Sequence, residues 1–173
     1  MKSTILLIVL SVLSMFLSCC NKLFPDEKLT LQRRDYTGNE LRTDGYYYYY
    51  TKNNSTAIYF LYRNGVILLA GVFSSYNLDN IEKEMIKYYG KYIKTDWGVF
   101  VIEGNSIQYE KWVEGLSGLI AAINRCSGYI ENDTTIHFAE SYYSGRKETK
   151  QINEVWHFKQ FDNKPDSTNV YIK

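Results

Sequence analysis

Short apolar or aromatic segments separated by tight-turn signals fill most of this 173-residue chain, and this pattern limits the fold more than any other feature. Asn64-Gly65 and Gly104-Asn105 each have the composition of a two-residue hairpin turn, whose central residues need positive φ. Tyrosine, which occurs 17 times, favours strands. The pattern predicts eight strands, at residues 46–51, 57–63, 66–73, 98–103, 106–113, 127–131, 134–142 and 152–161.

One helical segment interrupts the strands, at about residues 77–94. Its apolar residues recur at spacings of three and four, which places them on one stripe of a helix: Leu78, Ile81, Met85, Tyr88 and Tyr92. Asn77 is a favourable N-cap. The preceding segment 66–73 is apolar on both faces of a strand and needs cover on both sides. We therefore expect the helix to pack outside the sheet, over this strand.

Consecutive hairpins predict a mainly β fold, an antiparallel up-and-down meander of about eight strands. Closing such a meander removes its exposed edges. The expected architecture is similar to the lipocalin-like barrels of small envelope lipoproteins, as a barrel or half-barrel, although the usual Gly-x-Trp motif is not evident. An open sheet and a two-layer sandwich are the alternatives.

The N-terminus has the features of an export signal. Lys2 is followed by a nearly unbroken apolar run over residues 4–17, which is shorter than the roughly 20 residues that a membrane-spanning helix needs. The run ends in Ser18-Cys19-Cys20, which resembles the lipobox of bacterial lipoproteins. The resemblance implies a signal peptide at residues 1–18, cleavage before Cys19, and lipid attachment to the Cys19 thiol; Cys20 is the alternative acceptor.

This resemblance sets the expected domain organisation and location. Residues 19–44 would be a lipidated N-terminus and a tether that clears the membrane surface, and residues 45–173 a single β-rich domain. The protein would lie in the cell envelope, held to a membrane by its lipid. Asn21 stands where aspartate favours inner-membrane retention in similar lipoproteins, so the outer membrane is expected rather than the inner one.

The charged residues and cysteines argue against several classes of protein. The formal net charge is +1 and the longest basic cluster is Arg33-Arg34, so no nucleic-acid partner is expected. Cys126 is the only cysteine of the body, which implies a buried thiol and no disulfide framework. His137 and His157 alternate with large apolar residues and are expected to face solvent. We predict no metal site and no cofactor.

Candidate binding and modification residues are few. Tyr46, Tyr48 and Tyr50 share one strand face and form a candidate ligand-binding surface, since aromatic rings stack on sugars and peptides. The alternative is that these rings pack the core and shield neighbouring residues. Asp133-Thr134 and Asp166-Ser167 resemble the O-glycosylation motif of envelope proteins in Bacteroidota, which makes Thr134 and Ser167 candidate acceptors.

The sequence shows no catalytic constellation, and we expect a non-enzymatic protein. Glu103 and Glu110 are the only carboxylates considered as a glycosidase pair, and both are expected to face solvent. The predicted function is an envelope lipoprotein whose β domain binds a small apolar ligand, a glycan or a partner protein. The alternatives are a structural or assembly module of an envelope complex and, behind it, a wall- or glycan-directed hydrolase.

Overall fold

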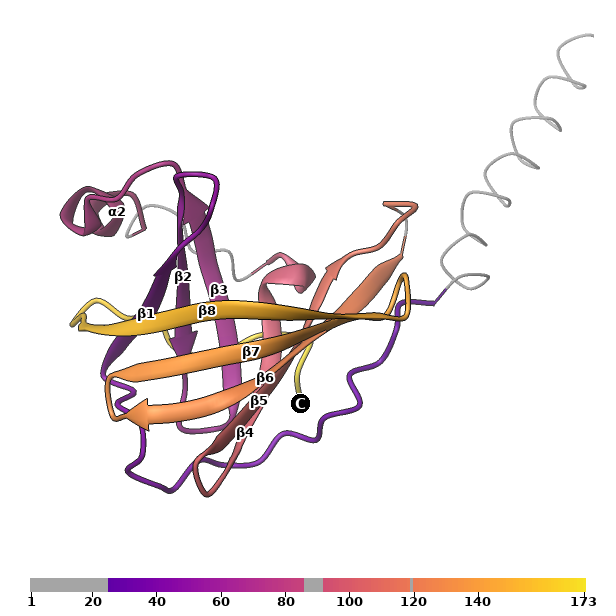
Figure 1. Cartoon of the computed structure of the whole chain (residues 1–173), viewed down its shortest axis with the longest axis horizontal. Coiled ribbons are helices and arrows are strands. Elements are labelled where there is room, and N and C mark those ends of the chain that lie inside the picture. The colour runs from indigo at the N-terminus through magenta and orange to yellow at the C-terminus, as the bar shows by residue number, and fades with distance from the viewer. Residues whose placement is uncertain (1–24, 86–91, 119) are drawn as a thin grey trace, which may run out of the picture.

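The computed structural model describes residues 25–85, 92–118 and 120–173, which form a closed antiparallel barrel (Figure 1). The eight strands follow one another around the barrel in sequence order, which confirms the predicted up-and-down meander and its lipocalin-like architecture. The strands are β1 (Gly45–Tyr50), β2 (Thr56–Leu61), β3 (Val66–Phe73), β4 (Trp97–Glu103), β5 (Ser106–Glu114), β6 (Ala121–Asn132), β7 (Thr135–Tyr143) and β8 (Glu148–Gln160).

The chain turns at both predicted hairpin positions, but only the glycine of each pair has positive φ, and Asn64 and Asn105 do not. Gly65 and Gly104 have φ angles of 75° and 60°, in the left-handed region that glycine adopts without strain. The predicted exposure to solvent is confirmed for His157, the neighbour of the fully buried Trp156, whereas His137 is half-buried.

The helical segment is shorter than predicted. Helix α2 spans Leu78–Met85, and the Asn77 Oδ1 accepts a hydrogen bond from the Asn80 amide at 3.1 Å, which confirms the N-cap. Residues 86–91 lie outside the described part. Lys94 belongs to a separate 3-10 turn, η1 (Lys94–Asp96), which leads directly into β4. No helix within the described ranges has the length and apolar character needed to cross a membrane.

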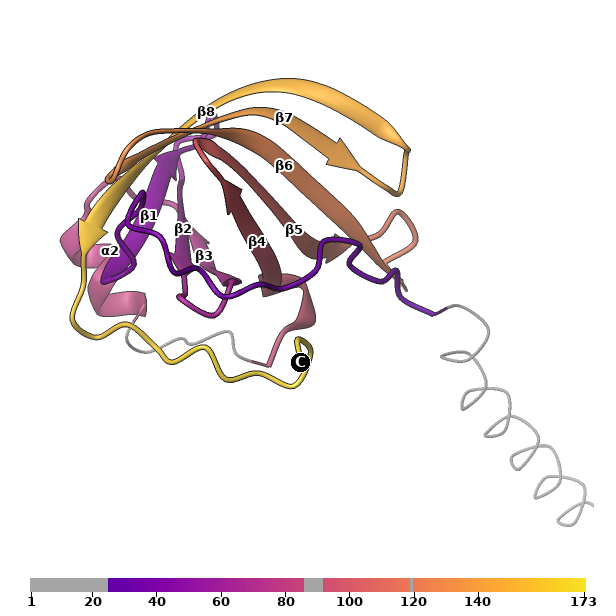
Figure 2. The same ribbon diagram turned by 90° about the horizontal axis from the view of Figure 1, so that it is seen from below.

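Two apolar layers lie on opposite sides of the strands. The barrel interior receives buried or half-buried side chains from every strand, with Trp156 among the largest. The second layer covers the outer face of β1 to β4, where Ile81 and Met85 of α2 and Phe161 of the C-terminal tail are buried. Figure 2 shows α2 and this tail on the outer side of that wall. The expected packing of the helix outside the sheet is therefore observed.

Residues 26–42, which we call the N-terminal strap, run along the barrel and across one of its ends (Figures 1 and 2). The strap is attached by Glu110, whose carboxylate accepts hydrogen bonds from the Thr30 and Leu31 amides at 2.6 and 2.7 Å. Arg125 Nε donates to the same carboxylate at 2.8 Å. The Glu110 side chain is fully buried, so its predicted exposure to solvent is wrong.

Hydrogen bonds explain how a carboxylate can be buried on the outer face of β5. Burial by itself would raise the pKa of Glu110, but the hydrogen bonds from Leu31, Thr30 and Arg125 outweigh this effect and hold the pKa below its ordinary value. The carboxylate therefore stays charged at neutral pH and fixes the strap.

The far end of the strap closes the barrel. Tyr36 and Leu41 are buried in the interior cluster, and the Leu41 amide donates to the Tyr36 hydroxyl at 2.7 Å. The Tyr36 and Arg42 amides donate to the carbonyls of Arg63 and Asp133, in two of the turns at this end. The prediction that residues 19–44 form a tether clear of the membrane does not describe the strap, which is part of the folded body.

Replacing Glu110 with alanine should loosen the strap and destabilise the fold. The variant leaves two amides and Arg125 without their acceptor, and we expect a loss of about 3 kcal/mol in the free energy of unfolding, measured by urea denaturation at neutral pH. Because the folded pKa of Glu110 is lowered, this difference should shrink as the pH falls below the ordinary carboxylate range.

The matched control is Glu103→Ala. Glu103 pairs with Arg34 at 3.2 Å, but both side chains are mostly exposed, and the loss should stay under about 0.5 kcal/mol. Equal effects of the two substitutions would show that Glu110 does not hold the strap.

Candidate functional site

The first and last strands of the barrel pair over only part of their length. Strands β1 and β8 pair through four residue pairs only, from Gly45–Gln160 to Tyr48–His157. Beyond these pairs β8 diverges from β1 (Figure 1). The opening between them is a cavity of about 570 Å³ lined by residues 49–52 and 151–155, which we call the mouth pocket. A cavity of this size accommodates a small organic molecule.

Stacked aromatic rings form one side of the mouth pocket. Tyr49 lies parallel to Trp156, with 5.7 Å between ring centroids and 1° between planes. Tyr59 stacks on the same indole at 4.3 Å and 19°. Phe138 also contacts Trp156, at 4.6 Å. These contacts restrict the indole and the Tyr49 ring, so this side of the pocket is formed before any ligand binds.

Glu154 points into the barrel beside these rings. Its Oε2 accepts a hydrogen bond from Trp156 Nε1 at 3.3 Å. Burial raises the pKa of Glu154, and the hydrogen bonds from Trp156 and Tyr49 only partly oppose this effect. No ion pair involves Glu154 among the residues that the structure describes. Glu154 is half-buried, and carboxyl groups that are removed from water without a cation are concentrated at functional sites.

The groups behind Glu154 are neutral at physiological pH. Tyr59 and Tyr109 are buried, and burial raises the pKa of both hydroxyls. Cys126 is buried as predicted, and burial likewise raises the pKa of its thiol, which therefore lacks the thiolate character of a nucleophile.

Lys111 is the buried cation of the interior, but it is engaged elsewhere. Its Nζ donates to the Thr95 carbonyl at 3.1 Å. Burial lowers the pKa of Lys111 to about 8, against the opposing negative charge of Asp96, and burial raises the pKa of Asp96 to about 6.

The three tyrosines predicted to bind a ligand face outward and differ in exposure. Tyr46 is fully buried beneath α2 and donates to Glu82 Oε1 at 2.8 Å, so its ring is not accessible. Tyr48 is half-buried, and Tyr50 is about half exposed at the rim of the mouth pocket. Tyr49 lies on the opposite face of β1 and is the ring of this strand that stacks on Trp156.

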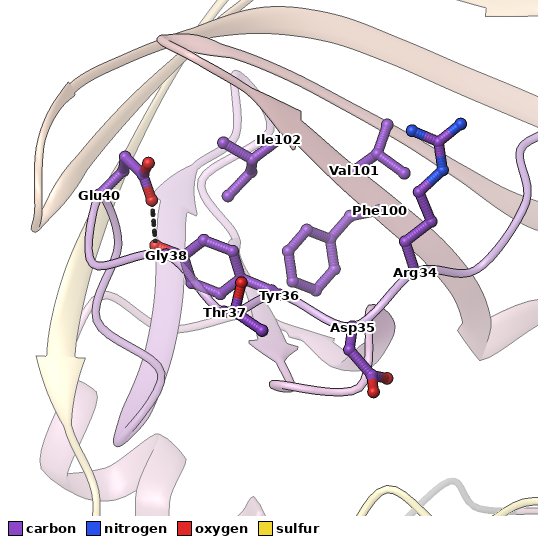
Figure 3. Close-up of a pocket in the computed structure, with 9 residues that line it drawn as sticks. All are labelled: Arg34, Asp35, Tyr36, Thr37, Gly38, Glu40, Phe100, Val101 and Ile102. Atoms are coloured by element: carbon purple, nitrogen blue, oxygen red, sulfur yellow. Dashed lines mark hydrogen bonds between the residues drawn. The ribbon is translucent and has the colours of Figure 1, made fainter.

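A second cavity, of about 250 Å³, lies between the strap and β4 (Figure 3). Its central side chain, Tyr36, is already engaged, because its hydroxyl donates to Glu40 at 3.0 Å and Arg63 lies over its ring at 4.9 Å. Tyr36 also packs edge-on against Phe100, 6.1 Å away (Figure 3). These contacts hold the strap across the barrel end, and we assign this region a structural role.

The other predicted residues are not brought together into a site. Glu110 is committed to the strap and lies four positions along β5 from Ser106, the partner of Glu103, so the two carboxylates do not form a glycosidase pair. The Thr134 hydroxyl donates to Asn132 at 2.8 Å and the Ser167 hydroxyl accepts from Asn64 at 2.9 Å. Both remain predicted glycosylation acceptors.

Neither the lipidation prediction nor the metal prediction is tested by the structure. Cys19 and Cys20 lie outside the described residues. Within the described ranges, no group of three or more His, Cys, Asp or Glu side chains is arranged to hold a metal ion. His137 instead contacts Glu131 at 2.7 Å and stacks on Tyr129.

Comparison with known proteins assigns no family to the chain: no protein-family model, curated protein or solved structure matches it.

Glu154→Gln should stabilise the protein at neutral pH and leave it unchanged in acid. The folded pKa of Glu154 is raised, so the wild type loses stability as the pH rises from the unfolded value toward the folded one. The variant lacks this loss, and we expect it to gain about 1 kcal/mol at about pH 7.5 and nothing at about pH 4, by urea denaturation.

Glu148→Gln provides the comparison on the same strand, because Glu148 is exposed and should show no such pH-dependent gain. A Glu154→Gln variant that is less stable than wild type at neutral pH would contradict this reading of the half-buried carboxyl group.

Proposed function

We propose that this chain is a lipid-anchored cell-envelope protein that binds a small molecule in the mouth pocket of its barrel without transforming it. The observation that carries the proposal is the preformed opening between β1 and β8, with stacked rings and the half-buried carboxyl group of Glu154. Binding sites are typically concave, largely apolar, and supplied with a few placed polar groups. The mouth pocket is concave, and its lining combines polar groups with the apolar surfaces of Tyr49, Ile152 and Val155.

The geometry favours a ligand with a flat or apolar part. Tyr49 and Tyr50 line the pocket, and Tyr49 is held parallel to Trp156. Aromatic faces stack on other rings and on the apolar faces of sugars. A small apolar compound or a glycan unit therefore fits the pocket better than an extended polymer.

The envelope location is supported by the sequence alone. The apolar run at residues 4–17 and the Ser18-Cys19 step resemble a lipoprotein signal. Two or three acyl chains on one cysteine would anchor the protein stably, since each buried methylene contributes about 0.8 kcal/mol. The membrane would then be the first partner of the chain.

A role as an assembly module is the second candidate, and one feature favours it. Tyr48, Tyr50 and Tyr76 form a ladder of edge-to-face rings on the outer surface, with centroid distances of 5.5 and 5.1 Å. Tyr50 and Tyr76 are each about half exposed. Clusters of accessible tyrosines are typical of protein interfaces.

Filling the mouth pocket should abolish binding there. Ile152 lines the pocket and is half-buried, so Ile152→Trp should place an indole in the opening. With the uncharged fluorescent dye Nile red as probe, we expect the variant to bind at least about tenfold more weakly than wild type in a fluorescence titration.

Val72→Trp is the control, because Val72 is exposed on β3 away from the pocket. Thermal melting of both variants checks that they fold. Equal dye affinity in wild type and Ile152→Trp would place the dye elsewhere and remove the support for this site.

Cys19→Ala should abolish lipid attachment. Metabolic labelling with palmitate should mark the wild type and leave the variant unlabelled, because only a thiol at this position accepts the lipid in the motif that the chain resembles. Cys20→Ala should keep its label. Full labelling of Cys19→Ala, with loss in Cys20→Ala, would identify Cys20 as the acceptor instead.

A further inference from the structure

We propose that the mouth pocket selects ligands that carry a positively charged amine, with Glu154 as the counter-ion and the Tyr49 ring beside it. This inference rests on the proposed function, since it names the ligand class of the same pocket.

The first argument is the unbalanced charge of Glu154. Its carboxyl group receives hydrogen bonds from Trp156 and Tyr49, whereas an ionised carboxylate can accept about four. Burying a carboxylate without a cation costs free energy that a cationic ligand would recover. Glu110 shows the usual solution in this same barrel, because it receives backbone amides, a hydroxyl and Arg125.

The second argument is that three lysines of the pocket lining, of β8 and of the interior do not pair with Glu154. Lys52 lines the mouth pocket but is exposed at its rim and makes no ion pair among the described residues. Lys150, on the same strand as Glu154, lies 3.6 Å from Glu148. Lys111 donates to the Thr95 carbonyl. The position opposite Glu154 is therefore available to a cation from outside the chain.

The third argument is the aromatic surroundings. Cations are attracted to the faces of tyrosine and tryptophan, and rings combined with a carboxylate form the usual site for alkylated amines. Tyr49 and Tyr50 line the pocket, and Trp156 lies directly behind Tyr49. An anionic ligand would instead meet the negative charge of Glu154, and a neutral sugar would gain no charge pairing from it.

The test compares three probes of similar size and different charge, together with a sugar. Phenylbutylamine, phenylbutanol, phenylbutyrate and N-acetylglucosamine are titrated into the mature protein by calorimetry at neutral pH, each also in competition with Nile red. We expect the amine to bind about tenfold or more tightly than the alcohol, and the carboxylate to bind most weakly.

Variants assign the preference to Glu154. Glu154→Gln should reduce the affinity for the amine to that for the alcohol while the alcohol is bound as before. Glu154→Asp keeps the charge and should keep a preference for the amine. Glu148→Gln, which alters an exposed carboxylate on the same strand, should behave as wild type.

Amine and alcohol affinities within about twofold of each other, tightest binding of the carboxylate or the sugar, or an amine preference that survives Glu154→Gln would each overturn the inference. If none of the four probes binds while Nile red still occupies the pocket, amine selectivity fails and the proposed binding site stands. Failure of the dye to bind at the pocket would reject both.

Discussion

All six side chains of β2 are buried, and this double-sided burial organises the rest of the molecule. One side of the strand faces the barrel interior, while the other needs an outer layer, which α2 and the C-terminal tail supply. This outer layer covers only the first part of β1, because Tyr46 is buried and Tyr50 is half exposed. The mouth pocket lies at this end of β1, beyond the outer layer and beyond the last residue pair with β8.

Two glutamates of the barrel, the buried Glu110 and the half-buried Glu154, have opposite pKa shifts. Glu110 is surrounded by donors that lower its pKa, and its role is to fasten the strap. Glu154 has a raised pKa, two hydrogen-bond donors and an adjoining cavity. The first arrangement includes a cation, Arg125, whereas the second has none among the described residues. This contrast distinguishes a structural carboxylate from a candidate ligand-binding one.

The local parts of the fold were predictable from sequence, and the long-range parts were not. Turns such as Asn64-Gly65 and the alternation around Trp156 depend on neighbouring residues, and they were predicted correctly. The strap was missed because its composition is polar and its attachment joins Thr30 to Glu110, 80 residues away. The inward orientation of Glu154 was predictable, because it alternates along the strand with Ile152 and Trp156 and therefore shares their face. Lipidation of Cys19 stays a prediction.

The attachment of the strap also limits how far the barrel can stand from a bilayer. Asp26 accepts a hydrogen bond from the Ala121 amide at the start of β6, next to the β5–β6 turn. In an up-and-down barrel this turn lies on the same rim as the β1–β2 and β7–β8 turns, which flank the mouth pocket. Acyl chains on Cys19 would be at most about 25 Å of extended backbone from Asp26. So short a connection would keep that rim, with the mouth pocket beside it, close to the lipid headgroups.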